Sequence, residues 1–146
     1  MSDVNPRVAA LFSFMEEVAR VVDDNVYEVS VESGEVMLRG HPENCSEISF
    51  SVTTDCGLIN QVWTSDGYMT GRTGYDDQPV EEIEAFISEL VAIGRQYLIQ
   101  RPVPTGFFFP KIVVHMPHRQ ETLRRTLFED LGRILSLRWI REVRAR

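Results

Sequence analysis

The sequence has only two cysteines and no long apolar run. Cys45 and Cys56 belong to no CxxC pair, so neither a disulfide framework nor a cysteine-rich metal site is predicted, and both thiols are expected to be free. No stretch approaches the roughly eighteen consecutive apolar residues of a membrane-spanning helix, and the N-terminus lacks the pattern of a secretion signal. These absences predict a cytoplasmic protein.

The proportions of residue types are those of an ordinary globular protein. Of the 146 residues, 43% are hydrophobic and 25% are charged. A chain of this size buries roughly two-thirds of its unfolded surface, which is enough for one self-sufficient core. We predict a single domain over residues 1–146.

The net charge of −7 conceals an uneven distribution of charge. Residues 1–100 carry eighteen acidic side chains against five arginines, whereas residues 101–146 carry ten basic side chains against four acidic ones. An acidic body repels nucleic acid and anionic membranes and attracts basic partners. We therefore expect no nucleic-acid or membrane partner, and we expect the C-terminal arginines to pair with carboxylates of their own domain.

The first two-thirds of the chain predicts a helix followed by a β-meander. Asn5 as N-cap and Pro6 at the first helical position begin an amphipathic helix whose apolar residues recur as far as Val22. The apolar period then changes to two, and turn residues such as Ser33 and Gly34 divide the chain into four or five antiparallel strands.

The last third predicts two more helices and a short extended region. Pro79 begins an amphipathic helix, and residues 107–109 and 112–114 are expected to form one or two edge strands. Pro117 precedes a last helix, whose apolar stripe contains Leu123, Leu127, Leu131, Ile134 and Leu135. The order predicts an α+β fold: an antiparallel meander sheet of about five to six strands on which an N-terminal, a middle and a C-terminal helix pack.

The sequence offers no convincing catalytic or metal-binding pattern. His115 and His118 flank Pro117, which prevents helical presentation of the two rings, and a surface loop is the favoured interpretation. Paired acidic residues could suggest acid/base catalysis, but they lie where helices begin or end. Helix capping and the helix dipole explain most of them. The glycines around Gly71 lack the lysine and the helix of a phosphate-binding loop. We predict a protein that is not an enzyme and that uses no cofactor and no metal.

Aromatic residues beside carboxylates give a better indication of function. Rings next to acidic groups are suited to anchoring a basic partner. The alternative is that Trp63 belongs to the core and the tyrosines cover an edge of the sheet. The candidate partner-binding residues are Trp63, Asp66, Tyr68, Arg72, Tyr75, Asp76 and Asp77.

Several features between Tyr27 and Pro110 occur together in one group of proteins. They are the strand pair around Ser33, Gly34 and Glu35, the strand of Trp63 leading to Gly71 and Arg72, an acidic loop, the helix from Val80 to Gly94 and Arg95, and the connector at Arg101 and Pro102. With these features the chain resembles immunity proteins of actinobacterial polymorphic toxin systems, the group that includes the immunity factor of the mycobacterial NAD-hydrolysing necrotizing toxin. The resemblance implies an antitoxin that binds and occludes a cognate toxin.

A weaker resemblance is to secretion-chaperone-like domains, which are small acidic α+β proteins. The order of helices and strands is similar, and the resemblance implies a protein that holds a peptide segment of a client protein. That group usually places three strands before its second helix, whereas four or five are predicted here. The sequence leaves open whether the protein is a monomer or a homodimer.

Overall fold

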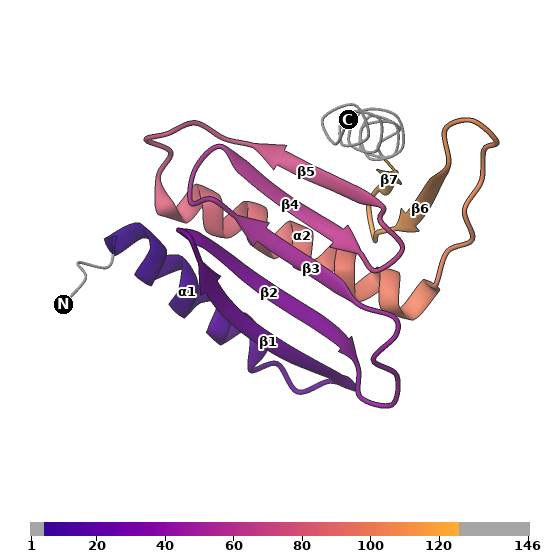
Figure 1. Ribbon diagram of the computed structural model, residues 1–146, viewed down its shortest axis with the longest axis horizontal. Coiled ribbons are helices and arrows are strands. Elements are labelled where there is room, and N and C mark those ends of the chain that lie inside the picture. Colours follow the sequence, from indigo (N-terminus) through magenta and orange to yellow (C-terminus); the bar gives the residue numbers. More distant parts are fainter. Residues whose placement is uncertain (1–4, 126–146) are drawn as a thin grey trace, which may run out of the picture.

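Two helices pack on one face of a seven-stranded antiparallel sheet in the computed structural model, which describes residues 5–125 (Figure 1). The strand order is β1-β2-β3-β4-β5-β7-β6. In chain order the elements are α1 (Pro6–Ala19), β1 (Asn25–Glu32), β2 (Glu35–Pro42), β3 (Phe50–Thr54), β4 (Ile59–Thr64), β5 (Met69–Thr73), α2 (Val80–Gln100), β6 (Lys111–His115) and β7 (Gln120–Arg124). The predicted α+β class and antiparallel sheet are confirmed, but the described chain has seven strands rather than five or six.

Helix α1 begins where the sequence predicts and ends earlier. The Arg7 N–H donates to the Asn5 side chain over 3.0 Å, and Pro6 occupies the first turn. The prediction that the helix continues to Val22 is wrong, because the helix ends at Ala19 and the Val22 side chain is 98% exposed. The Asp23 side chain accepts the N–H of Asn25 at the start of β1, which favours a turn over further helix.

The first five strands form the predicted meander. Ser33 and Gly34 both have positive φ, 52° and 80°, as a two-residue hairpin turn requires. Each strand from β1 to β5 pairs with the next one along the chain. Side chains on alternate positions, such as Leu38 and Val52, are fully buried beneath the helices.

The centre of the core is the ring of Phe50 against α2. Phe50 is fully buried and meets Tyr27 edge-on, with 6.4 Å between ring centroids. A Cβ atom at Gly94 would lie 2.2 Å from the Phe50 ring. Glycine at this position therefore allows the helix to approach the sheet closely.

The prediction of a helix directly after Pro117 is wrong for the described residues. Met116 N–H donates to the Arg119 carbonyl, which closes a hairpin between β6 and β7. Leu123 pairs with Ile112 across this hairpin, and both side chains are buried. Pairing between the two strands of this hairpin thus overrides an apolar spacing that also fits a helix. The remaining stripe residues, Leu127, Leu131, Ile134 and Leu135, lie outside the described residues.

Candidate partner-binding surface

One end of the sheet gathers carboxylates from segments that are far apart in the sequence. The β1–β2 turn, the β3–β4 turn, the β5–α2 loop and the first turn of α2 meet there, at the left in Figure 1. We call this surface the acidic end, and its carboxylates are Glu32, Glu35, Asp55, Asp76, Asp77, Glu81 and Glu82.

Exposed apolar side chains lie on the same segments. Val31, Leu58, Ile59 and Tyr75 are between 43% and 53% exposed. The Tyr75 hydroxyl lies 3.5 Å from a Glu82 carboxylate oxygen, so the loop and the first turn of α2 are neighbours. Apolar and aromatic side chains surrounded by charged groups are typical of protein-binding surfaces.

Arg7 of α1 ties two of these loops together. Its guanidinium donates to the Cys56 carbonyl from Nε and Nη2, over 3.2 and 2.9 Å, and from Nη2 to the Gln78 carbonyl over 2.5 Å. Charge-assisted hydrogen bonds of this kind are roughly twice as strong as neutral ones. The β3–β4 turn and the β5–α2 loop are thus held in position by a residue of the N-terminal helix.

Buried polar side chains beneath the β3–β4 turn fix its shape further. Thr54 Oγ1 donates to Asn60 Oδ1 over 2.6 Å, and Asn60 Nδ2 donates to the Gly57 carbonyl over 3.2 Å. The Asp55 carboxylate accepts the N–H groups of Gly57 and Ile59. A surface shaped in advance loses less conformational entropy when it binds a partner.

Cys56 lies within this turn and is not available as a nucleophile. Burial, together with the neighbouring Asp55 charge, raises the pKa of the Cys56 thiol, although Arg7 partly opposes the change. The thiol therefore stays protonated at neutral pH. Its Sγ lies 3.9 Å from the Gly34 carbonyl, which brings the β1–β2 turn against the β3–β4 turn.

Of the residues predicted to bind a partner, Tyr75, Asp76 and Asp77 are together in the β5–α2 loop of the acidic end. Asp66 is not with them, because it lies in the turn before β5 and the loop follows β5. The two connections are at opposite ends of the strand (Figure 1). Successive turns of a meander alternate between the ends of the sheet, and this alternation could have been read from the sequence.

Tyr68 does not contribute to any exposed surface. Its side chain is only 3% exposed and belongs to the hydrophobic core. Trp63 is half-buried on the face of the sheet opposite the helices, where its Nε1 donates to the Gln61 side chain over 3.0 Å. Neither ring lies on the acidic end.

Arg72 is partly buried and forms ion pairs with carboxylates of α2 and β7. Its Nε lies 3.0 Å from Glu89 and its Nη2 lies 2.7 Å from Glu121. Arg119 pairs with the same two carboxylates. Strands β5 and β7 pair only at Met69 and Arg124, so these ion pairs span the place where the two strands have separated. They connect β5 to β7 and to α2.

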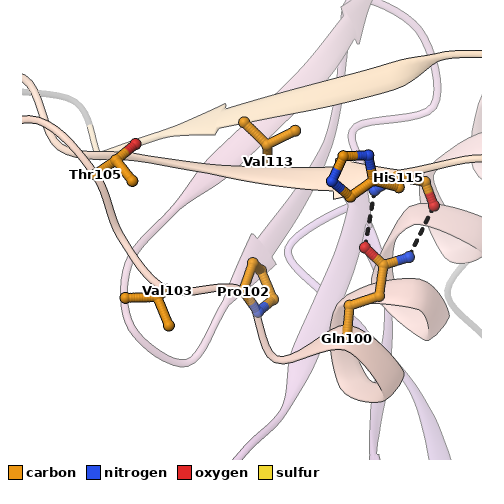
Figure 2. Close-up of a pocket in the computed structure, with 6 residues that line it drawn as sticks. All are labelled: Gln100, Pro102, Val103, Thr105, Val113 and His115. Atoms are coloured by element: carbon orange, nitrogen blue, oxygen red, sulfur yellow. Dashed lines mark hydrogen bonds between the residues drawn. The ribbon is translucent and has the colours of Figure 1, made fainter.

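Two clefts lie at the other end of α2. Figure 2 shows the smaller one, of about 440 Å³, between the connector after α2 and strand β6. The Gln100 carboxamide lines this cleft: it accepts the His115 N–H over 2.8 Å and donates to the His115 carbonyl over 2.7 Å. The larger cleft, of about 770 Å³, lies between the start of β1 and the end of α2 and is lined by both carboxylates and arginines.

Asp23 lines the larger cleft and is tied to Tyr27 and Arg95. Burial alone would raise the pKa of Asp23, but hydrogen bonds from Tyr27 and Asn25 and the charge of Arg95 together lower it. The Arg95 guanidinium donates to the Tyr27 hydroxyl over 3.0 Å and to the Val18 carbonyl over 3.0 Å. The cluster therefore joins α1, β1 and α2.

Neither cleft brings metal ligands together. Within residues 5–125, no three His, Cys, Asp or Glu side chains are close enough to one another to hold a metal ion. No helix among these residues is long and apolar enough to cross a membrane. No family model matches this chain, and no curated protein or solved structure matches it either.

Proposed function

We propose that this protein is an immunity protein that binds a cognate toxin through the acidic end and so blocks the toxin's active site. The proposal rests above all on the acidic end itself, where carboxylates surround exposed apolar side chains on loops that Arg7 holds in place. Occlusion requires an accurately shaped surface and no catalytic group.

The charge of this surface indicates the chemistry of the partner. An acidic surface attracts a basic region and accelerates diffusional encounter with it. Tyr75 and Leu58 would supply the apolar contacts that resist dissociation. A toxin that acts on an anionic substrate carries a basic cleft, and such a cleft is complementary to the acidic end.

The test is co-expression with the product of the adjacent gene, followed by a binding measurement on the purified pair. We expect a stoichiometric complex and loss of toxicity. Changing Asp76→Asn and Asp77→Asn together should weaken binding at least tenfold, which corresponds to about 1.4 kcal/mol. Tyr75→Ser should have an effect of similar size.

A matched control is Glu16→Gln with Glu17→Gln, which makes the same change of charge on exposed residues of α1. This pair should leave the affinity nearly unchanged. A toxin that stays fully active beside the parent protein would refute the proposal. Equal weakening by both pairs of substitutions would show that net charge matters and that the acidic end does not.

The chaperone alternative predicts binding of a short client peptide by a homodimer. Five strands precede α2 in the structure, whereas that group usually has three. We therefore favour the immunity function. Light scattering and peptide titration of the isolated protein distinguish the two, because the alternative requires both a dimer and a peptide complex.

A further inference from the structure

Three consecutive phenylalanines are exposed in the loop before β6. Phe107, Phe108 and Phe109 are 91%, 72% and 65% exposed. We call residues 106–110 the Phe loop; it lies at the upper right in Figure 1, away from the acidic end. Single exposed apolar residues are common, but a patch of adjacent exposed rings indicates a surface that binds a protein, a membrane or a ligand.

The loop holds the rings outward in a fixed arrangement. Thr105 and Lys111 exchange two backbone hydrogen bonds of 2.9 Å, which close the loop at its base. Gly106 has φ of 95°, a conformation that glycine adopts without strain. The rings of Phe107 and Phe108 meet edge to face, with centroids 5.0 Å apart. The conformation of the Phe loop thus keeps its rings exposed.

Two cationic side chains, Lys111 and Arg124, lie at the base of this loop. Lys111 pairs with Arg124 across β6 and β7, so both side chains project from the same face of the sheet. Neither makes an ion pair with a carboxylate among residues 5–125. The sequence contains no acidic residue from position 90 to position 120. The β4–β5 turn, which carries Asp66, lies near the end of β7. A Cβ atom at Gly67 in this turn would be 3.7 Å from the side chain of Arg125, the residue that follows β7.

We propose that the Phe loop docks on an anionic lipid surface. Aromatic rings partition into the interface between headgroups and acyl chains, and neighbouring Lys and Arg side chains bind anionic headgroups. A narrow loop with three outward rings suits insertion into a bilayer better than contact with a flat protein surface. The site is peripheral, because it requires no spanning helix.

The arrangement of charge would also orient the protein on the membrane. Lys111 and Arg124 lie beside the start of β5, because Arg124 pairs with both Lys111 and Met69. The other end of β5 leads into the acidic end. An anionic surface attracts the first end and repels the second. This proposal departs from the expectation of no membrane partner, which was drawn from the acidity of residues 1–100, and it does not depend on the proposed immunity function.

The test is co-sedimentation of the full chain with vesicles of phosphatidylcholine that contain about one-third phosphatidylglycerol. We expect binding to these vesicles at low salt and little binding to vesicles of phosphatidylcholine alone. The double substitution Phe107→Ser and Phe108→Ser should lower partitioning about tenfold or more. Lys111→Gln with Arg124→Gln should lower it and weaken its dependence on salt.

Val22→Ser removes another exposed apolar side chain, far from the loop, and should change nothing. Phe108→Trp gives a readout that does not rely on loss of binding. The fluorescence emission of the introduced tryptophan should shift to shorter wavelength with the anionic vesicles and not with vesicles of phosphatidylcholine alone. Absence of sedimentation at low salt would overturn the proposal. Undiminished sedimentation of the variant with both Phe107→Ser and Phe108→Ser would overturn it too. So would the finding that a protein partner buries these rings and that lipid does not.

Discussion

Small side chains decide how closely α2 can approach the sheet. The prediction concerns Gly94→Ala, which places a methyl group 2.2 Å from the ring of fully buried Phe50. Ala gains about 1 kcal/mol of helix propensity over Gly. Overpacking a core costs about 1 to 3 kcal/mol, and here the ring has no free space to enter. We therefore expect a net loss of about 1 to 2 kcal/mol in urea unfolding.

Ser88→Ala is the matched control for Gly94→Ala, because Ser88 is exposed on the same helix. Its free energy of unfolding should stay within about 0.5 kcal/mol of the parent value. An equal or higher stability of the Gly94→Ala protein would mean that Phe50 moves aside without cost.

A second prediction at the residue scale concerns pH and Asp23. Its pKa is lowered in the folded protein from an ordinary value of 3.8, so its contribution to stability is present above that value. The contribution is lost as pH falls through the folded pKa. The difference in urea midpoint between the parent and Asp23→Asn should thus be largest at neutral pH and should shrink below about pH 4.

Asp24→Asn makes the same change of charge one residue away and controls for net charge. If the Asp23→Asn difference is the same at neutral and at acid pH, then the hydrogen bonds of Tyr27 and Asn25 do not stabilise the carboxylate form. Circular dichroism at each pH establishes that both variants remain folded.

The element whose attachment is least secured by backbone pairing is the β6–β7 hairpin. Only one residue pair joins β7 to β5, and the ion pairs of Arg72 span the opening beside it. Arg72→Gln leaves the largely buried Glu121 with one cation fewer. We expect a loss of about 1 to 2 kcal/mol, more than an exposed ion pair contributes.

A double-mutant cycle with Glu121→Gln measures this interaction. Because the two side chains are in contact, a coupling of at least about 0.5 kcal/mol is expected. Arg39→Gln, on an exposed position of β2, is the control and should change stability little. Additive effects of Arg72→Gln and Glu121→Gln would show that the pair does not hold the strands together.

Elements with strong local signals were predictable from the sequence, and the element whose conformation is decided by strand pairing was not. The Asn5 cap, the turn at Ser33 and Gly34, and the stripe of α2 act within a few residues. Strand β7 is short, and its Leu123 also fits helical spacing. Only pairing with β6 decides its conformation, and a local pattern does not contain that pairing.

The same distinction applies to the candidate site. The acidic loop at Tyr75, Asp76 and Asp77 was predicted because the residues are adjacent in sequence. The contribution of Arg7 was not predicted, since Arg7 contacts Gln78, a residue 71 positions further along the chain. Burial of Tyr68 could not be inferred either, because this residue lies in the turn before β5, where hydrogen bonds between its backbone and Thr64 fix its position.

At the scale of the whole molecule, the acidic and basic regions lie at different places on the surface. If the acidic end binds a toxin as proposed, it should steer the basic surface of that toxin towards one orientation. We predict that the association rate of the complex falls steeply as salt is raised while the dissociation rate changes little. Stopped-flow mixing with the cognate toxin measures both rates. An association rate that is independent of salt would contradict a steering role for this surface.

The Gln100 side chain has a consequence for the solubility of the protein. An outer strand such as β6 exposes backbone groups to which a strand of another molecule can add, and such additions lead to aggregation. Gln100 occupies the hydrogen-bonding position at His115, and Thr105 occupies the one at Lys111. Both ends of β6 are thereby closed by the protein's own chain. The outer edge of β6 therefore offers a neighbouring molecule no continuous row of free backbone groups. This protects the β6–β7 hairpin from adding strands of other molecules and so from aggregation.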